Sequence, residues 1–253
     1  MVGIDISSGS GNINFHQLKN AGYEFVIARA GYGSDVNQVD SKFHSYVGDA
    51  LVAGLHVGAY WFIYARTIDE AEENAKCFAE VLDGWRGRLD MPVYIDYEYD
   101  STRYYEQETG LKEDRVIATE MVRQAADFME RMYGYYSGVY LNPDYIKNHI
   151  DLPKLSRYTL WLAQWGADKP SYDCGIWQTA GDTKIVLGGT LCNVDLNRCY
   201  IDFPTVIRRN GLNGFKASDA PQADGKGKGV SGDKWEVIDT GDGYTVKLGG
   251  KQG

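Results

Sequence analysis

The sequence predicts an α/β protein, folded as an irregular TIM-like (β/α) barrel that ends in antiparallel strands. Short β-rich runs alternate with helical patterns, which is typical of parallel strands joined by helices. After Trp177 the helical patterns stop, and two short strands flank Gly188 and Gly189 with no room for a helix. The 253 residues suffice for one large domain with a small appendage.

Seven segments have the apolar, β-branched or aromatic composition of strands. They are Val2 to Ser7, Phe25 to Ala30, Val57 to Phe62, Val93 to Glu98, Gly138 to Leu141, Thr159 to Gln164 and Gly175 to Gln178. Three segments are predicted to be helices: Asp40 to Ala53, Thr67 to Leu82 and Glu113 to Tyr133. The second is the clearest, because Thr67 is a suitable N-cap, acids fill the first turn, and apolar residues form one stripe.

The chain is predicted to have three parts. Residues 1–207 form the barrel, and residues 208–234 are a flexible linker, because they are poor in large apolar residues and rich in Gly, Ala, Asp and Lys. Residues 235–253 are expected to form one hairpin around Gly241 to Gly243, which is only marginally stable alone. This hairpin is either the start of an incomplete C-terminal module or a piece that docks on the barrel.

Composition excludes several functions. The net charge of −9 argues against nucleic acid as a partner, because phosphate backbones need clustered Lys and Arg. No stretch has the length of a membrane span, and the first ten residues lack the pattern of a signal peptide. The 19 tyrosines and six tryptophans suit a site for a ligand with flat apolar faces, such as a sugar. Because no C-x-x-C pair is present, we expect free thiols and no zinc site at Cys77, Cys174, Cys192 and Cys199.

The stretch MPVYIDYEYD places three acids on alternate positions of an apolar strand. On an extended strand Asp96 and Glu98 share one face, whereas Asp100 is expected to lie past the strand end. In a closed barrel the first and last strands are neighbours, so Asp5 and Asp195 are expected beside these two acids at the carboxyl mouth. Several buried acids in one cavity raise the pKa of at least one of them, and a protonated acid beside an ionised one can cleave a glycosidic bond.

Other chemistries fit the sequence less well. Metal binding is the competing use of clustered acids, but a calcium-loop spacing is missing and a flat D-x-E strand surrounds a cation poorly. We therefore expect no metal and no cofactor. Ser-His-Asp catalysis is disfavoured because the chain has no G-x-S-x-G motif, and its four histidines lie in helical or linking stretches. The GYGSD segment at 31–35 lacks the phosphate-loop lysine and is expected to be a loop at the mouth.

Eight motifs together resemble the glycoside hydrolase family 25 lysozymes, the Chalaropsis-type muramidases that are common as bacteriophage endolysins. They occur in the family's order over about residues 1–207: GIDIS, FVIARAGYG, GAYWF, PVYIDYE, GVYLN, LWLAQW, IWQTA and VDLN. The resemblance implies an irregular (β/α) barrel that cleaves the β-1,4 bond between N-acetylmuramic acid and N-acetylglucosamine. Its partners would be peptidoglycan glycan strands.

By matching position, the resemblance implies that Glu98 is the general acid and Asp96 its partner carboxylate. Asp5 and Asp195 match the other two acids of the family's cleft. Asp96 could attack the anomeric carbon or orient the substrate's own 2-acetamido group. We favour the assisted route, because the sugar then supplies a nucleophile already in place.

The resemblance also implies a sugar groove lined by aromatic and amide side chains. Arg29 occupies a place where a basic residue is usual, which suits a lactyl or peptide carboxylate. Trp61 departs from the family, which more often has histidine in the GAYWF motif. The positions that match the groove are Tyr60, Tyr140, Trp161, Gln164, Trp165, Trp177 and Gln178.

The sequence therefore favours a muramidase over two alternatives. We expect a phage or prophage lysin that is made in the host bacterial cytoplasm and acts on the cell wall after release, since no signal peptide is visible. The alternative from another class is a catalytically silent barrel that binds glycan, and the presence of both Asp96 and Glu98 counts against it. A family 18 chitinase is disfavoured because its D-x-x-D-x-D-x-E run is not met.

Overall fold

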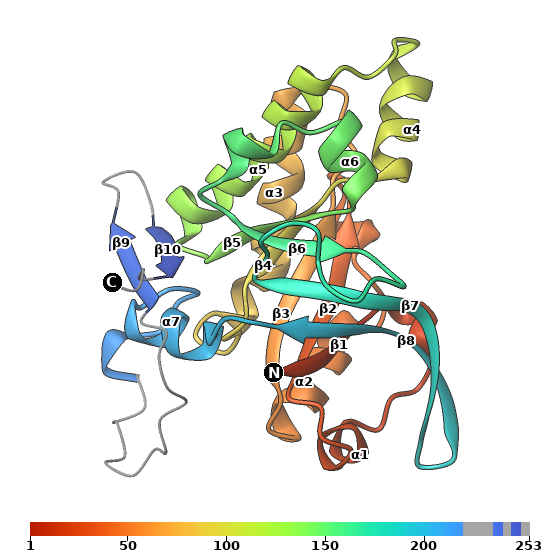
Figure 1. The fold of residues 1–253 in the computed structure, drawn as a ribbon, viewed down its shortest axis with the longest axis vertical. Coiled ribbons are helices and arrows are strands. Elements are labelled where there is room, and N and C mark those ends of the chain that lie inside the picture. Colours follow the sequence, from red (N-terminus) through yellow and green to blue (C-terminus); the bar gives the residue numbers. More distant parts are fainter. Residues whose placement is uncertain (220–234, 240–243, 249–253) are drawn as a thin grey trace.

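The computed structural model describes residues 1–219, 235–239 and 244–248, and it confirms the predicted fold class as a closed eight-stranded barrel (Figure 1). Neighbouring strands from β1 to β7 pair in parallel, and β8 lies antiparallel between β7 and β1. The strands are β1 (Val2–Ile6), β2 (Phe25–Tyr32), β3 (His56–Phe62), β4 (Val93–Asp96), β5 (Ser137–Leu141), β6 (Thr159–Ala163), β7 (Ile176–Leu187) and β8 (Thr190–Cys199).

Seven α-helices are found in the described ranges, and they include the three predicted ones. Thr67 caps the second of these as expected, because its Oγ1 accepts a hydrogen bond from the Glu70 N–H at 3.2 Å. Four short helices were not predicted, since each buries only a few residues. The helices are α1 (Phe15–Asn20), α2 (Phe43–Val52), α3 (Ile68–Leu82), α4 (Tyr99–Thr109), α5 (Arg115–Tyr133), α6 (Pro143–Asn148) and α7 (Phe203–Arg209).

Strand β4 is shorter than predicted, and this changes the setting of one acid. The strand ends at Asp96, and Glu98 is the N-cap of α4 instead of a strand residue. The Glu98 N–H donates to Ser101 Oγ at 3.3 Å, so the turn into the helix begins at this acid. Asp100 lies in the first turn of α4, beyond the strand end as expected. Asp96 and Glu98 therefore flank a strand-to-helix turn.

The last two barrel strands form one long hairpin. Strand β7 runs unbroken through both the predicted segment ending at Gln178 and the first strand of the predicted hairpin. It turns at Gly188 and Gly189, as predicted, and the tip of the hairpin extends beyond the barrel wall (Figure 1). The base of this hairpin is part of the barrel, and it therefore carries side chains into the interior.

Large rings fill the barrel interior beneath its mouth, opposite small residues on neighbouring strands. Phe25, Tyr94 and Trp161 are buried in this inner cluster, and a Cβ added at the neighbouring glycines would lie 2.4–2.5 Å from other atoms. Each glycine precedes an inward-facing residue near the mouth by two positions, the period of a strand. These pairs are Gly3 with Asp5, Gly58 with Tyr60 and Gly138 with Tyr140.

Gly138→Ala is expected to destabilise the fold by about 1–3 kcal/mol, because the added methyl group overpacks the barrel. Its Cβ would lie 2.4 Å from the Tyr94 ring and 2.7 Å from Thr159 Cγ2. Chemical denaturation measures the change. Gly84→Ala is the matched control, since no atom lies within 4 Å of its added Cβ; equal stability of the two variants would contradict the tight interior.

The predicted boundary at residue 207 lies too early, because the chain that follows packs against the barrel. Asn213 is fully buried, and its Nδ2 donates to the backbone oxygens of Leu89 and Met91. Arg208 on α7 forms an ion pair with the buried Asp90 at 2.9 Å. Of the predicted linker, 220–234 lies outside the described residues.

The predicted C-terminal hairpin is described only in its strands. These are β9 (Trp235–Asp239) and β10 (Tyr244–Leu248), which pair antiparallel in a sheet of two strands, apart from the barrel sheet. The predicted turn around Gly241 to Gly243 lies outside the described residues. Whether the hairpin begins a further module stays a prediction.

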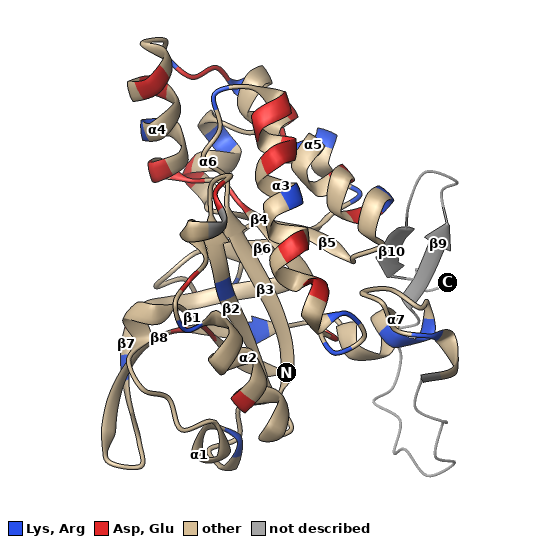
Figure 2. Cartoon of the chain, turned by 180° about the vertical axis from the view of Figure 1, so that it is seen from behind, with Lys and Arg blue, Asp and Glu red and all other residues tan. Residues whose placement is uncertain are grey.

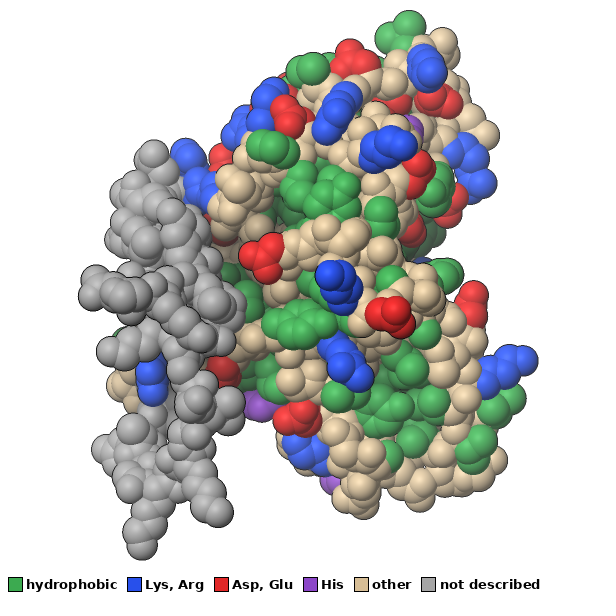
Figure 3. Space-filling view, in the orientation of Figure 1, with side chains coloured by type: hydrophobic (Ala, Val, Ile, Leu, Met, Phe, Trp, Pro, Cys, Tyr) green, Lys and Arg blue, Asp and Glu red, His purple; other side chains and the backbone are tan. Residues whose placement is uncertain are grey.

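The surface of the described chain mixes charges of both signs. Figure 2 shows many acidic residues on α3, α4 and α5, with basic residues among them. On the face seen in Figure 3, charged side chains are interspersed with hydrophobic ones. Within the described residues, no helix has the length and apolar composition needed to cross a membrane, and no three metal-binding side chains are grouped. The four cysteines are free thiols, and two of them are buried.

Candidate active site

Asp5 and Asp195 face each other across the seam where β1 pairs with β8. Asp5 is 6% exposed, and its Oδ2 accepts hydrogen bonds from Asn197 Nδ2 at 2.7 Å and Gln178 Nε2 at 3.0 Å. Burial, together with the charge of Asp195, raises the pKa of Asp5 to about 7. The predicted meeting of the first and last strands therefore brings this pair of acids together.

Asp195 is held from two sides. Its Oδ1 accepts from the Asp182 N–H at 2.7 Å, and its Oδ2 accepts from Gln178 Nε2 at 3.3 Å. Burial raises its pKa, and the charge of Asp182 adds to this rise. A pocket of about 160 Å³ opens beside the pair, lined by Asp5, Ile6, Ser7, Gly9, Ser10, Tyr60, Asp182, Asn193, Val194 and Asp195.

Asp96 and Glu98 are close enough to this pair to interact with it electrostatically. Burial, followed by the charges of Glu98 and Asp5, raises the pKa of Asp96 well above its usual value. Burial, then Asp100 and Asp195, raises the pKa of Glu98 to about 7. Oδ1 of Asp96 is buried without a hydrogen-bond partner in the described chain. The four acids predicted from the sequence thus share one electrostatic environment, in which a carboxyl can be protonated near neutral pH.

Tyr60 and Tyr140 lie among these acids, but they are buried rather than open. Burial, together with nearby carboxylates that include Asp5 and Asp96, raises the pKa of both phenols well above its usual value. Both rings pack edge-on against Trp161, at centroid distances of 5.7 and 4.7 Å. Trp161 itself is 1% exposed, so it supports the site from below and offers no open face to a sugar.

The other predicted groove residues divide into two pairs. Gln178 points into the barrel at the acids, and Trp165 beside it is 56% exposed at the mouth (its Nε1 donates to Gln178 Oε1 at 2.9 Å). Gln164 and Trp177 are not brought to the acids. Gln164 Oε1 accepts from the N–H and the Oγ of Ser171, and Trp177 Nε1 donates to the Gln164 backbone oxygen. This second pair fixes the loop between β6 and β7.

Arg29 is inside the site region but already has a partner. Its Nη2 lies 2.8 Å from Oδ2 of the buried Asp40, and its positive charge lowers the pKa of Asp96 against the larger effects that raise it. Trp61, the departure from the family pattern, does not line the mouth. It is fully buried on the outer side, where its ring stacks on Phe78 of α3. The histidine-to-tryptophan difference therefore leaves the acids untouched.

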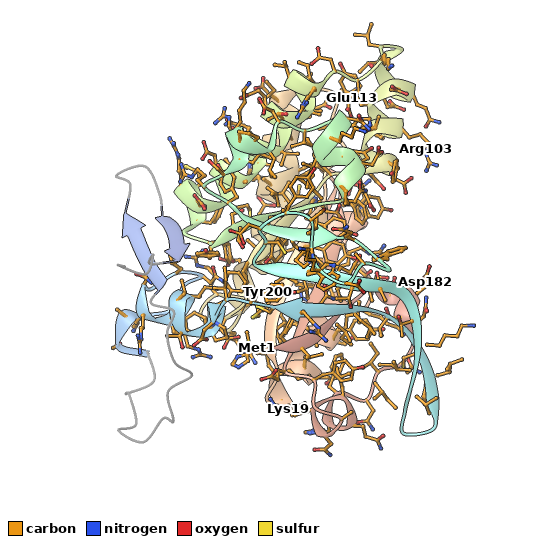
Figure 4. The ribbon with its side chains drawn as sticks, viewed as in Figure 1. Met1, Lys19, Arg103, Glu113, Asp182 and Tyr200 are labelled. Carbon is orange, nitrogen blue, oxygen red and sulfur yellow. The ribbon has the colours of Figure 1, made fainter. Side chains whose placement is uncertain are left out.

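Sequence reasoning missed two supports of the acids. Asn197 binds Asp5, and its position two residues after Asp195 on one strand could have indicated a shared face. Glu113, labelled in Figure 4, is buried and accepts a hydrogen bond from the Tyr97 hydroxyl at 2.7 Å. Tyr97 lies between Asp96 and Glu98, so this contact fixes the turn that carries both acids. No local pattern signalled it, because the two residues are 16 positions apart.

The acids lie where the parallel strands end, since Asp5 and Asp96 stand at or next to the last residues of β1 and β4. Figure 4 shows Arg103 on α4 and Asp182 on β7 on that same side of the molecule. A closed (β/α) barrel with an acid and its carboxylate partners at this mouth has the architecture of a glycoside hydrolase.

Comparison with known proteins agrees with this class. The sequence model of the family described as glycosyl hydrolases family 25 matches residues 4–186. The chain therefore belongs to glycosyl hydrolase family 25. The chain is 29% identical over 178 residues to the autolytic lysozyme of Clostridium acetobutylicum, an alignment that covers 68% of this chain and 48% of that protein. It is 24% identical over 215 residues to Lysozyme M1 of Streptomyces globisporus, covering 78% and 66% respectively.

Two solved structures share the fold. The crystal structure of the CTP1L endolysin superposes with a TM-score of 0.67 at 25% identity, over 81% of this chain and 68% of that one. A family 25 glycosyl hydrolase from Bacillus anthracis superposes with a TM-score of 0.64 at 20% identity, over 85% and 93%. The chain spans less than two thirds of the length of both curated lysozymes.

Proposed function

We propose that this chain is an N-acetylmuramidase, which hydrolyses the β-1,4 bond between N-acetylmuramic acid and N-acetylglucosamine in peptidoglycan. The observation that carries the proposal is the convergence of Glu98, whose pKa is raised to about 7, with three further acids at the mouth of a family 25 barrel. The names of the two lysozyme relatives support the substrate class. Similarity to an endolysin supports a role in lysis after release from the cytoplasm of the host bacterium.

In the proposed mechanism Glu98 donates its proton to the oxygen of the leaving sugar. A general acid needs a pKa near the working pH, and burial beside other acids supplies it. Asp96 then orients the 2-acetamido group of the substrate, whose carbonyl oxygen attacks the anomeric carbon. Water later opens this intermediate, with Glu98 acting as the base. Asp5 and Asp195 stabilise the positive charge that develops on the sugar ring.

Incubation of the protein with purified peptidoglycan, followed by assay of new reducing ends, tests the proposal. Release of reducing sugars by wild type is the expected result. The alternative, a catalytically silent glycan-binding barrel, predicts that the protein sediments with peptidoglycan without releasing reducing ends. The buried, unpartnered Oδ1 of Asp96 supports ligand binding at this mouth, because an unsatisfied buried oxygen is costly unless a ligand uses it. The raised pKa of Glu98 favours the enzyme, because catalysis needs a proton donor and glycan binding does not.

The rate of hydrolysis is expected to fall as the pH rises above about 7. The pKa of Glu98 is raised to about 7, so the carboxyl is protonated below that pH and loses its proton above it. Initial rates on purified peptidoglycan between pH 4 and 9 at constant ionic strength measure the profile. A rate that stays constant or rises up to pH 9 would contradict Glu98 as the acid.

A further inference from the structure

Two buried carboxamides hold the acid pair of β1 and β8. Gln178 is 1% exposed, and its Nε2 donates to Oδ2 of both Asp5 and Asp195. Its Oε1 accepts from the Tyr140 hydroxyl at 3.2 Å and from Trp165 Nε1 at 2.9 Å. A flipped amide would turn its oxygen toward the two carboxylates and its NH₂ group toward the indole N–H of Trp165, so these three hydrogen bonds would be lost and only the one with the Tyr140 hydroxyl, which can also accept, could be kept. The network therefore fixes one orientation.

Asn197 repeats this arrangement on the adjacent strand. It is also 1% exposed, and its Oδ1 accepts from Trp161 Nε1 at 2.8 Å. Its Nδ2 donates to Asp5 Oδ2 at 2.7 Å and to the backbone oxygen of Asp195 at 3.2 Å. In both cases an indole N–H occupies the amide oxygen, and the amide NH₂ group is thereby directed at Asp5.

The donors matter because the acids around Asp5 oppose its ionisation. Burial and the charge of Asp195 raise its pKa, whereas the hydrogen bonds from Asn197 and Gln178 lower it. Without these donors Asp5 would bind its proton more tightly, and the negative charge at the mouth would fall. The titratable groups that interact with Asp5 from the surrounding strands are Asp195 on β8, Asp96 on β4, Tyr60 on β3 and Tyr140 on β5.

We propose that Gln178 and Asn197 are positioning residues whose NH₂ groups favour the ionised form of Asp5, that Gln178 also holds the Asp195 carboxylate, and that the indoles of Trp165 and Trp161 set the orientation of the two amides. This inference rests on the proposed muramidase function, because the ionised pair stabilises the cationic sugar. It also changes the role predicted for Trp161, Trp165 and Gln178. These residues were expected to line the sugar groove, and here their polar atoms support the acids.

At Trp165, hydrogen-bond donation to Gln178 can be distinguished experimentally from stacking on a sugar. Its ring is 56% exposed, whereas its N–H is used inside the site. Trp165→Phe keeps an aromatic face, although a smaller one, and removes the N–H donor. A matched control is Trp85→Phe, which removes an indole N–H that donates to His44 Nδ1 at 2.9 Å, between the end of α3 and α2, which carry none of the four acids.

The experiment measures kcat and KM on soluble muramic acid–glucosamine oligosaccharides, together with the carboxyl titration of Asp5 and Asp195 by ¹³C NMR. For Trp165→Phe we expect kcat to fall on the order of tenfold with KM little changed, and the carboxyl midpoint to rise by about one pH unit. The acid limb of the kcat profile moves to higher pH with it. Trp85→Phe is expected to match wild type in all three measurements.

Gln178→Glu provides a second variant of nearly the same shape. At pH 7 its carboxylate offers only acceptors to two acids, so kcat is expected to fall further than in Trp165→Phe, with a smaller loss at pH 5. Thermal unfolding verifies that each variant is folded. A rise in KM alone, or an unchanged carboxyl midpoint in folded Trp165→Phe, would overturn the proposal. If wild type cleaves no oligosaccharide, the proposed function fails, and the NMR midpoint still decides the positioning role.

Discussion

Glu98→Gln is expected to abolish the hydrolysis of purified peptidoglycan while the barrel stays folded. The amide has the shape of the carboxyl but cannot transfer a proton to the leaving sugar. Loss of the general acid lowers the rate by roughly 10²- to 10⁴-fold, which takes lysis below detection in an ordinary assay. Glu108→Gln, an exposed position on the same helix, is the matched control and should lyse walls like wild type.

Glu98→Gln is also expected to change how the stability of the fold depends on pH. Folding raises the pKa of Glu98 from 4.5 to about 7, so the folded state binds the proton more tightly than the unfolded chain. Wild type therefore loses stability as the pH rises through this window. Glu98→Gln has no such charge to bury, and its melting temperature should exceed that of wild type at pH 8 but not at pH 4.5. Lysis of cell walls by Glu98→Gln at the wild-type rate would contradict Glu98 as the general acid.

Asp96→Asn is expected to lower kcat by about 10²- to 10³-fold or more, the effect of losing one preorganised electrostatic partner. Asp96 is 2% exposed, and its Oδ1 has no hydrogen-bond partner in the described chain, so this oxygen is available to bind the substrate. Initial rates on purified peptidoglycan measure the loss, with the exposed Asp49→Asn of α2 as the control. A loss of less than about threefold would make Asp96 a structural acid.

The elements with strong periodicity could be predicted, and those with weak periodicity could not. Helix α3 buries one clear apolar stripe after a capping threonine, and its bounds differ by one residue from the prediction. Helix α4 buries only Ser101 and Tyr105, so its sequence carries no helical signal. The alternate acids Asp96 and Glu98 look like a continued strand for the same reason. The cap contact between Glu98 and Ser101 marks the turn in the structure.

The positions of the acids could be predicted where strand parity and barrel closure decide them. Asp5 and Asp195 meet because β1 and β8 close the barrel, which follows from the order of the strands. The roles of Trp161 and Trp177 could not be read in this way. Each is an aromatic residue in a strand, but whether it packs inward, outward or at the mouth depends on neighbours far along the chain. Asn197 was missed because the sequence does not show which group a side-chain amide near an acid will hydrogen-bond.

The proposed bond specificity is tested most directly by mass spectrometry of the peptidoglycan fragments that the wild-type protein releases. Fragments are reduced with borohydride, so that the sugar at each new reducing end is marked by its mass. Cleavage after N-acetylmuramic acid predicts that the new reduced ends are muramitol. New reduced ends on N-acetylglucosamine would contradict the muramidase assignment, even if the wall is lysed and Glu98 is essential.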